Sequence, residues 1–65
     1  MGSPPISFIQ ENVGSYAYVF TKETNIFNGY YTGVLKEFAD NKIVLDNDIT
    51  IDYENIRKIY FEDIN

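Results

Sequence analysis

Carboxylates are the most numerous side chains in this 65-residue chain that could do chemistry. Ten Asp and Glu stand against five Lys and Arg, which gives a formal net charge of −5, and the chain has neither Cys nor His. A pair of carboxylates can serve as acid and base in hydrolysis, and a cluster of them can bind calcium. Without Cys and His, however, the chain lacks thiolate ligands, the usual general base and the commonest zinc ligand.

The densest set of acidic side chains is better interpreted as a turn than as a calcium site. The set comprises Asp46, Asn47, Asp48 and Asp52. A calcium loop also needs a glycine and a bidentate glutamate at fixed places over about twelve residues, and neither is present. Because Asp and Asn tolerate the unusual backbone dihedrals of a hairpin, we predict that residues 46–48 form a turn.

The other carboxylates show no pattern of an acid–base pair. Nothing marks two of them as buried or opposed; those considered are Glu37, Asp40, Glu54, Glu62 and Asp63. Charged side chains of this kind are ordinarily solvated. We therefore predict that the chain is not an enzyme and uses no cofactor or metal.

Aromatic side chains make up 17% of the chain, a high fraction, and several of them could stack single-stranded bases. These are Tyr16, Tyr18, Phe20, Tyr30, Tyr31 and Tyr60. Such a platform needs a basic groove beside it, but the cations are scattered along the sequence, at Lys22, Lys36, Lys42, Arg57 and Lys58. As strand neighbours, Arg57 and Lys58 should point to opposite faces. With a net charge of −5, the chain is not expected to bind nucleic acid tightly.

Short alternating segments joined by tight turns predict a small all-β domain that closes as a five-stranded barrel. The expected strands are residues 16–21, 30–38, 41–45, 49–52 and 56–61, with a loop over residues 22–29 and a 3₁₀ turn at residues 53–55. Gly33 inside the second strand marks a bend or a close backbone approach. The expected core is Val19, Leu35, Ile43, Leu45, Ile51, Ile56 and Ile59.

The two ends frame this domain. Residues 1–5 are interpreted as a disordered or tag-derived start, residues 6–61 as the single small β-barrel domain, and residues 62–65 as a frayed C-terminus. Within the domain, residues 6–13 have roughly helical apolar spacing, with Ser7 as a cap and Gly14 at the left-handed C-terminal position. This helical segment should cover one end of the barrel.

The chain shows no sign of a membrane partner. No apolar run approaches the roughly 20 residues that span a bilayer, and no signal segment opens the sequence. The absence of Cys fits a reducing compartment. We therefore expect a cytoplasmic location.

The run from Gly14 to Ile59 resembles the C-terminal SH3-like domain of the bacterial ribosome maturation factor RimP family. The matching elements are Gly14 with Ala17 and Val19, then Tyr31-Thr-Gly33-Val-Leu35, Lys42-Ile-Val-Leu45, and Ile51-Asp-Tyr53-Glu54-Asn55-Ile56-Arg57-Lys58-Ile59. The first half is also similar to an Sm motif, through Asp40, Asn41, Val44 and Leu45. The Arg-Gly pair of the second Sm motif has no counterpart, since Lys58 follows Arg57.

The resemblance implies a non-enzymatic protein-interaction module that works in maturation of the small ribosomal subunit by docking on a basic protein. The alternatives are an Sm-like RNA-binding protein that forms rings by pairing edge strands, and a small adaptor of another pathway.

A partner-binding surface is predicted on the first strand. The periodicity of this strand leaves its orientation open, but the resemblance to the RimP family implies that Ala17 and Val19 face the core. The outward residues Tyr16, Tyr18 and Phe20 then form a predicted partner-binding patch, to which Tyr30 of the second strand is added. We expect this patch to bind either a separate, basic protein or a second copy of the chain.

Overall fold

The computed structural model describes residues 4–22 and 29–62. The elements are the helix α1 (Ile6–Glu11), the strands β1 (Tyr16–Thr21), β2 (Tyr30–Ala39), β3 (Lys42–Leu45), β4 (Thr50–Asp52) and β5 (Ile56–Phe61), and a 3₁₀ turn, η1 (Tyr53–Asn55). The predictions for residues 1–3, for most of the loop at 22–29 and for residues 63–65 lie outside the described residues.

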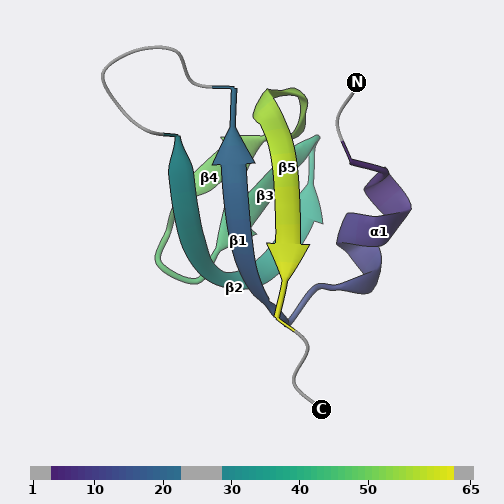
Figure 1. Cartoon of the computed structure of the whole chain (residues 1–65). Helices are drawn as coiled ribbons and strands as arrows, with labels where there is room; N and C mark the ends of the chain where they lie inside the picture. The colour runs from purple at the N-terminus through teal and green to yellow at the C-terminus, as the bar shows by residue number, and fades with distance from the viewer. Residues whose placement is uncertain (1–3, 23–28, 63–65) are drawn as a thin grey trace.

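The five strands form one antiparallel sheet in the order β4-β3-β2-β1-β5. β2, β1 and β5 make a layer at the front of Figure 1, with β3 and β4 behind it. The predicted all-β fold with five strands and a short N-terminal helix is confirmed. Closure of the barrel stays a prediction, because β4 and β5 are the two ends of the strand order within the part of the chain that is described.

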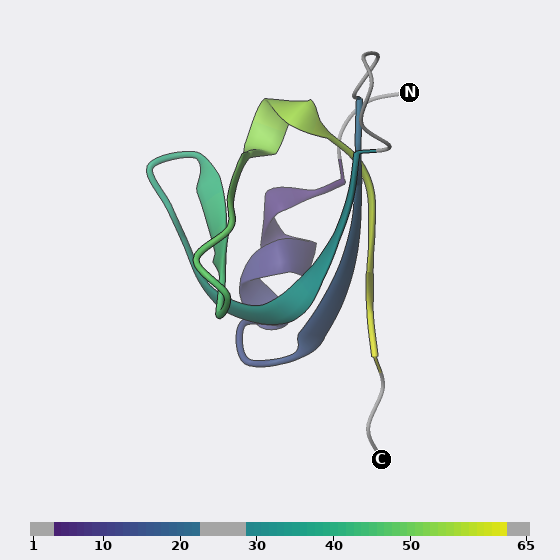
Figure 2. The same cartoon turned by 90° about the vertical axis from the view of Figure 1, so that its left-hand side faces the viewer.

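β2 carries the chain from one layer to the other, and it bends sharply where it does so (Figure 2). Its pairing moves from β1 to β3, with a register shift between Leu35 and Glu37. Gly33 precedes this shift with φ +156°. A Cβ there would lie 3.0 Å from Oδ1 of Asp46 and 3.3 Å from Cβ of Leu45. The predicted close approach at Gly33 is therefore confirmed.

Two tight turns join the strands of the rear layer. Asp40 and Asn41 have φ of 53° and 63°, the two left-handed positions of a type I′ hairpin. In the next turn Asp48 has φ 67°, and Oδ1 of Asp46 accepts a hydrogen bond from the backbone N–H of Val34 at 3.1 Å. The predicted turn at residues 46–48 is confirmed, and the side chain of Asp46 connects it to β2.

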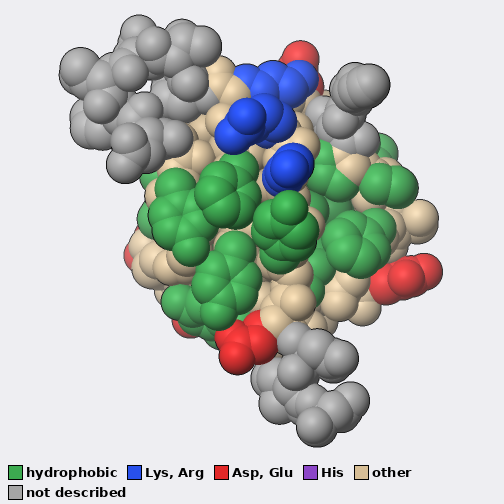
Figure 3. All heavy atoms as spheres, viewed as in Figure 1, with side chains coloured by type: hydrophobic (Ala, Val, Ile, Leu, Met, Phe, Trp, Pro, Cys, Tyr) green, Lys and Arg blue, Asp and Glu red, His purple; other side chains and the backbone are tan. Residues whose placement is uncertain are grey.

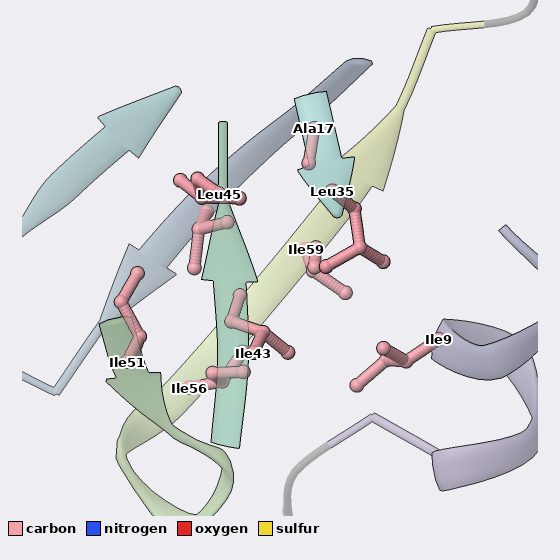
Figure 4. Packing of buried hydrophobic residues seen from close by; sticks show 9 residues of the cluster. Ile9, Ala17, Leu35, Ile43, Leu45, Ile51, Ile56 and Ile59 are labelled. Atoms are coloured by element: carbon pink, nitrogen blue, oxygen red, sulfur yellow. The ribbon is translucent and has the colours of Figure 1, made fainter. Parts of the chain in front are cut away.

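The core lies inside the bend of the sheet (Figure 4). All seven predicted core residues are buried there, together with Ile9 and Ala17. Ala17 and Val19 are both fully buried, which determines the orientation of β1. Burying one Leu or Ile side chain contributes about 1.5–3 kcal/mol, so these few residues supply most of the stability of so small a domain.

α1 lies beside β5 and covers the open side of the bent sheet (Figure 1). Ile9 enters the core, and the Phe8 ring contacts the Phe61 ring edge-on at 5.4 Å. The prediction of Ser7 as the cap is wrong: the N-cap is Pro5, whose extended conformation leads directly into the helix. No described helix is long and apolar enough to cross a membrane.

Candidate protein-binding face

The side of the front layer that is turned away from the core displays nine side chains, and we call it the outer face. The alternation that buries Ala17, Val19 and Thr21 turns the intervening residues of β1 away from the core. The neighbouring strands continue the pattern. The outer face consists of Tyr30, Thr32 and Val34 on β2, Tyr16, Tyr18 and Phe20 on β1, and Lys58, Tyr60 and Glu62 on and just after β5.

The strand register arranges these side chains in three rows that cross the strands. The central row is Thr32, Tyr18 and Tyr60. The cationic row is Tyr30, Phe20 and Lys58. The acidic row is Val34, Tyr16 and Glu62, where the backbone N–H of Glu62 donates to the Tyr16 carbonyl at 2.9 Å. Five of the nine positions are therefore aromatic, and the two charges, Lys58 and Glu62, stand at opposite ends of the outer face.

The aromatic rings contact one another across and along the strands. Phe20 lies 4.7 Å from the Tyr30 ring and 6.1 Å from the Tyr60 ring, measured between centroids. Tyr16 and Tyr18 meet edge-on at 5.3 Å. Even so, Tyr16, Tyr30 and Tyr60 remain 36%, 47% and 52% exposed. The ring contacts form two groups, and these lie side by side because Tyr18 and Tyr60 are paired across β1 and β5. Together they make one apolar surface, which is seen in green in Figure 3.

Two tyrosine hydroxyls of this face are held by polar partners. The Tyr16 hydroxyl donates to Oγ1 of Thr32 at 3.2 Å, and the Tyr18 hydroxyl donates to Oε1 of Glu62 at 3.0 Å. The hydrogen bond to Glu62 raises the pKa of Tyr18 above its usual value, and desolvation and the negative charge of Glu62 act in the same direction. Tyr18 is therefore a neutral donor near pH 7, held in a defined position on the face.

Three cations gather at one end of the outer face, which corrects the prediction that they are scattered. Lys58 on β5 lies opposite Phe20 on β1 in the strand register. Lys22 follows β1, and its backbone N–H donates a hydrogen bond to the carbonyl of Asn55, just before β5 begins. Arg57 lies between them in a bulge, because Phe20 pairs with Lys58 while Thr21 pairs with Ile56. The bulge leaves both Arg57 and Lys58 exposed, so they do not alternate across the strand as predicted. Figure 3 shows these charges in blue above the aromatic surface.

Nearly all of the carboxylates in the described residues lie away from the outer face. Among the described residues, Glu62 is its single carboxylate. The other described carboxylates are on α1, beyond the bend of β2, in the turns, on β4 and in η1: Glu11, Glu37, Asp40, Asp46, Asp48, Asp52 and Glu54. The chain is thus acidic overall, whereas the aromatic surface is close to neutral.

The structure brings all four predicted partner-binding residues, Tyr16, Tyr18, Phe20 and Tyr30, onto this one face. It adds Tyr60, which was considered only as a stacking residue; the alternation of Lys58, Tyr60 and Glu62 is the signal that could have placed it. Tyr31 points to the other side of β2 and packs against the core. The N-terminal helix packs on the core and on Phe61 and leaves these aromatics uncovered.

A separate cleft of about 230 Å³ lies beside β4. It is lined by Thr21, Tyr31, Ile49, Thr50, Ile51, Asp52 and Asn55. Its ionisable side chains are Asp52 and Tyr31. Within residues 4–22 and 29–62, no three acidic side chains are grouped closely enough to hold a metal ion.

Comparison with protein-family models, with curated proteins and with solved structures gives no significant match to this chain. The resemblance to the ribosome maturation factor domain and to Sm proteins therefore stays a prediction from the quoted residues.

Proposed function

We propose that the chain is a non-enzymatic protein-interaction module and that the outer face is its contact surface. The observation that carries the proposal is the connected surface of Tyr16, Tyr18, Phe20, Tyr30 and Tyr60, which no described part of the chain covers. Soluble monomers seldom leave such a surface open unless it binds something. Tyrosines are also enriched among the residues that dominate the energy of protein interfaces.

The small-subunit maturation role is the narrower form of this proposal, and only the sequence resemblance supports it. The location of the charges bears on the expected partner. Lys58, Arg57 and Lys22 stand beside the aromatics, so the face favours a partner that brings carboxylates to that end. A basic partner, expected from the net charge of −5, would find its counter-charges elsewhere on the surface.

Site-specific photocrosslinking tests the proposal. A benzophenone amino acid replaces Tyr60, which is 52% exposed on the face, or Val13, which is 47% exposed and lies outside it. Each variant is irradiated alone and with the protein mixture extracted from bacterial small ribosomal subunits. We expect protein adducts from position 60 and not from position 13. Adducts from neither position, or from both equally, would contradict the proposed contact surface.

A truncation at the centre of the face supplies a quantitative test. Tyr18→Ala should weaken the captured interaction by about 1–3 kcal/mol, because central aromatics commonly dominate an interface. The far-ultraviolet circular dichroism and the melting curve should show a retained fold, since the ring lies on the outer side of β1. Loss of the fold would assign Tyr18 to the core, and unchanged binding would remove it from the interface.

A further inference from the structure

The two charges of the outer face make it self-complementary. Lys58 on β5 and Glu62 just after it are four residues apart, about 13 Å in extended chain, with Tyr60 midway between them. The central row thus lies halfway between the cationic row and the acidic row. A two-fold axis along the central row would exchange the two outer rows.

From this arrangement we infer that the outer face binds a second copy of the same chain, through a two-fold axis that runs along the central row. This inference rests on the proposed function of the face and names its partner. In the resulting dimer Lys58 of each copy lies opposite Glu62 of the other. Phe20 lies opposite Tyr16, and Tyr30 lies opposite Val34. A two-fold interface presents the same patch from both copies, as this match requires.

The alternative two-fold axis, parallel to the strands, is disfavoured. It would place Lys58 opposite Tyr30 and Glu62 opposite Val34, so both charges would be covered by apolar or uncharged groups. Covering a charge without a partner is costly. The axis along the central row satisfies both charges and packs the two sheets face to face with antiparallel strands.

The overall negative charge does not prevent this contact. The seven other described carboxylates lie outside the outer face, so the surfaces that meet carry one cation and one anion each. Lys22 and Arg57 lie beside the cationic row and add to its attraction for Glu62 of the other copy. At about 0.15 M salt, charges more than about 8 Å apart are largely screened, so the remaining repulsion is weak.

The area of the outer face indicates how tightly two copies should bind each other. Three strands and three rows cover about 14 Å by 20 Å. Two such faces cover roughly 600 Å² together, which is below the range of stable interfaces and typical of weak contacts, so we expect only a weak, reversible dimer, with a Kd of about 10–100 µM. Sedimentation equilibrium between about 5 µM and 1 mM covers this range. The chain should shift from 7.6 kDa towards twice that mass as concentration rises.

Charge exchange tests the register of the dimer. Lys58→Glu and Glu62→Lys should each raise the dimer Kd about tenfold, because each places two pairs of like charges opposite one another. The double variant Lys58→Glu/Glu62→Lys should restore the Kd to within about threefold of the parent. The matched control, Lys42→Glu/Glu62→Lys, has the same net charge as that double variant. It leaves Lys58 of each copy opposite a lysine, so its dimer should stay weak. Equal recovery in both double variants would overturn the pairing.

Isotope-filtered NMR on a mixed labelled and unlabelled sample gives an independent readout. An intermolecular contact between the Phe20 and Tyr16 rings is expected, and one between two Phe20 rings would contradict the axis. A chain that stays monomeric to about 1 mM would overturn the dimer. If the chain is monomeric but position 60 still crosslinks to another protein, the proposed function stands and only the dimer is overturned. If the chain stays monomeric and position 60 captures no protein, both proposals fail; tight binding of single-stranded RNA to the face would also overturn both.

Discussion

The Tyr18 hydroxyl donates a hydrogen bond to Oε1 of Glu62 at 3.0 Å, although the two residues are 44 positions apart in the chain. The contact exists because β1 and β5 are neighbours in the sheet, which aligns Tyr18 with Tyr60 and the backbone of Tyr16 with Glu62. It joins the centre of the outer face to its acidic end. The position of the one carboxylate on the face is thereby defined.

The ionisation of Tyr18 should report this hydrogen bond. Because the bond is made only by the protonated phenol, Tyr18 should lose its proton at a higher pH than an ordinary tyrosine, whose pKa is about 10. The stabilisation is present below pH of about 10 and is lost as the pH rises through the raised pKa. NMR titration of ¹³C-labelled tyrosines measures this. Glu62→Gln should lower the Tyr18 pKa, whereas Glu54→Gln, in η1, should leave it unchanged.

The core should depend on Leu35, the fully buried residue next to the bend of β2. Leu35→Ala removes packing inside the sheet and should lower the free energy of unfolding by about 2–5 kcal/mol, a large part of the total for a small domain. Urea denaturation followed by circular dichroism measures the change. The exposed neighbour gives the control: Lys36→Ala should stay within about 0.5 kcal/mol of the parent. An unchanged midpoint for Leu35→Ala would contradict the burial.

Gly33 should tolerate side chains far less well than Gly14. A Cβ at position 33 meets Oδ1 of Asp46 at 3.0 Å and Cβ of Leu45 at 3.3 Å, whereas nothing lies within 4 Å of one at position 14. Both glycines have positive φ, +156° at Gly33 and +103° at Gly14, so a side chain strains the backbone at either position, but only at Gly33 does it also meet crowding. Thermal melts should show Gly33→Val to be less stable than Gly14→Val by about 1–3 kcal/mol. Equal melting temperatures would indicate that the turn at residues 46–48 moves aside freely.

The β2–β3 turn should accept glycine and reject a β-branched residue. Asn41 has φ 63°, and its carbonyl accepts a hydrogen bond from the backbone N–H of Tyr53 at 2.9 Å. Asn41→Gly keeps that bond and removes the left-handed strain, so stability should be retained or rise slightly. Asn41→Val should cost about 1–2 kcal/mol. Chemical denaturation of the two variants side by side checks the difference, and a more stable Asn41→Val would refute the type I′ assignment.

Nucleic-acid binding should be weak despite the cations beside the aromatics. Lys22, Arg57 and Lys58 stand at one end of the outer face, and Glu62 stands at the other. At about 150 mM salt, we expect a Kd for single-stranded oligonucleotides above about 1 µM. Fluorescence anisotropy with U-rich and A-rich oligonucleotides measures it. Tight, sequence-selective binding would favour the Sm-like alternative over a protein-interaction module.

The sequence by itself determined most of the local structure. Alternation of apolar and polar residues predicted the strands, and the Asp and Asn residues predicted the turn at residues 46–48, because side-chain periodicity and turn dihedrals depend on near neighbours. The same alternation identified seven core residues, from Val19 to Ile59, as buried. Gly33 could be identified as a close approach because a glycine inside a strand has few other uses.

Only the tertiary structure decided what shares a surface. β1 alone has two apolar sides, so its orientation depended on the pairing with β2 and β5. Tyr60 and Glu62 lie on the outer face because β5 and the residue after it pair with β1. The bulge at Arg57 turned two cations outward, where strict alternation predicted one on each side. Contacts between residues distant in the chain depend on which strands become neighbours and in which register, and that is decided by packing of the whole core rather than by local preference.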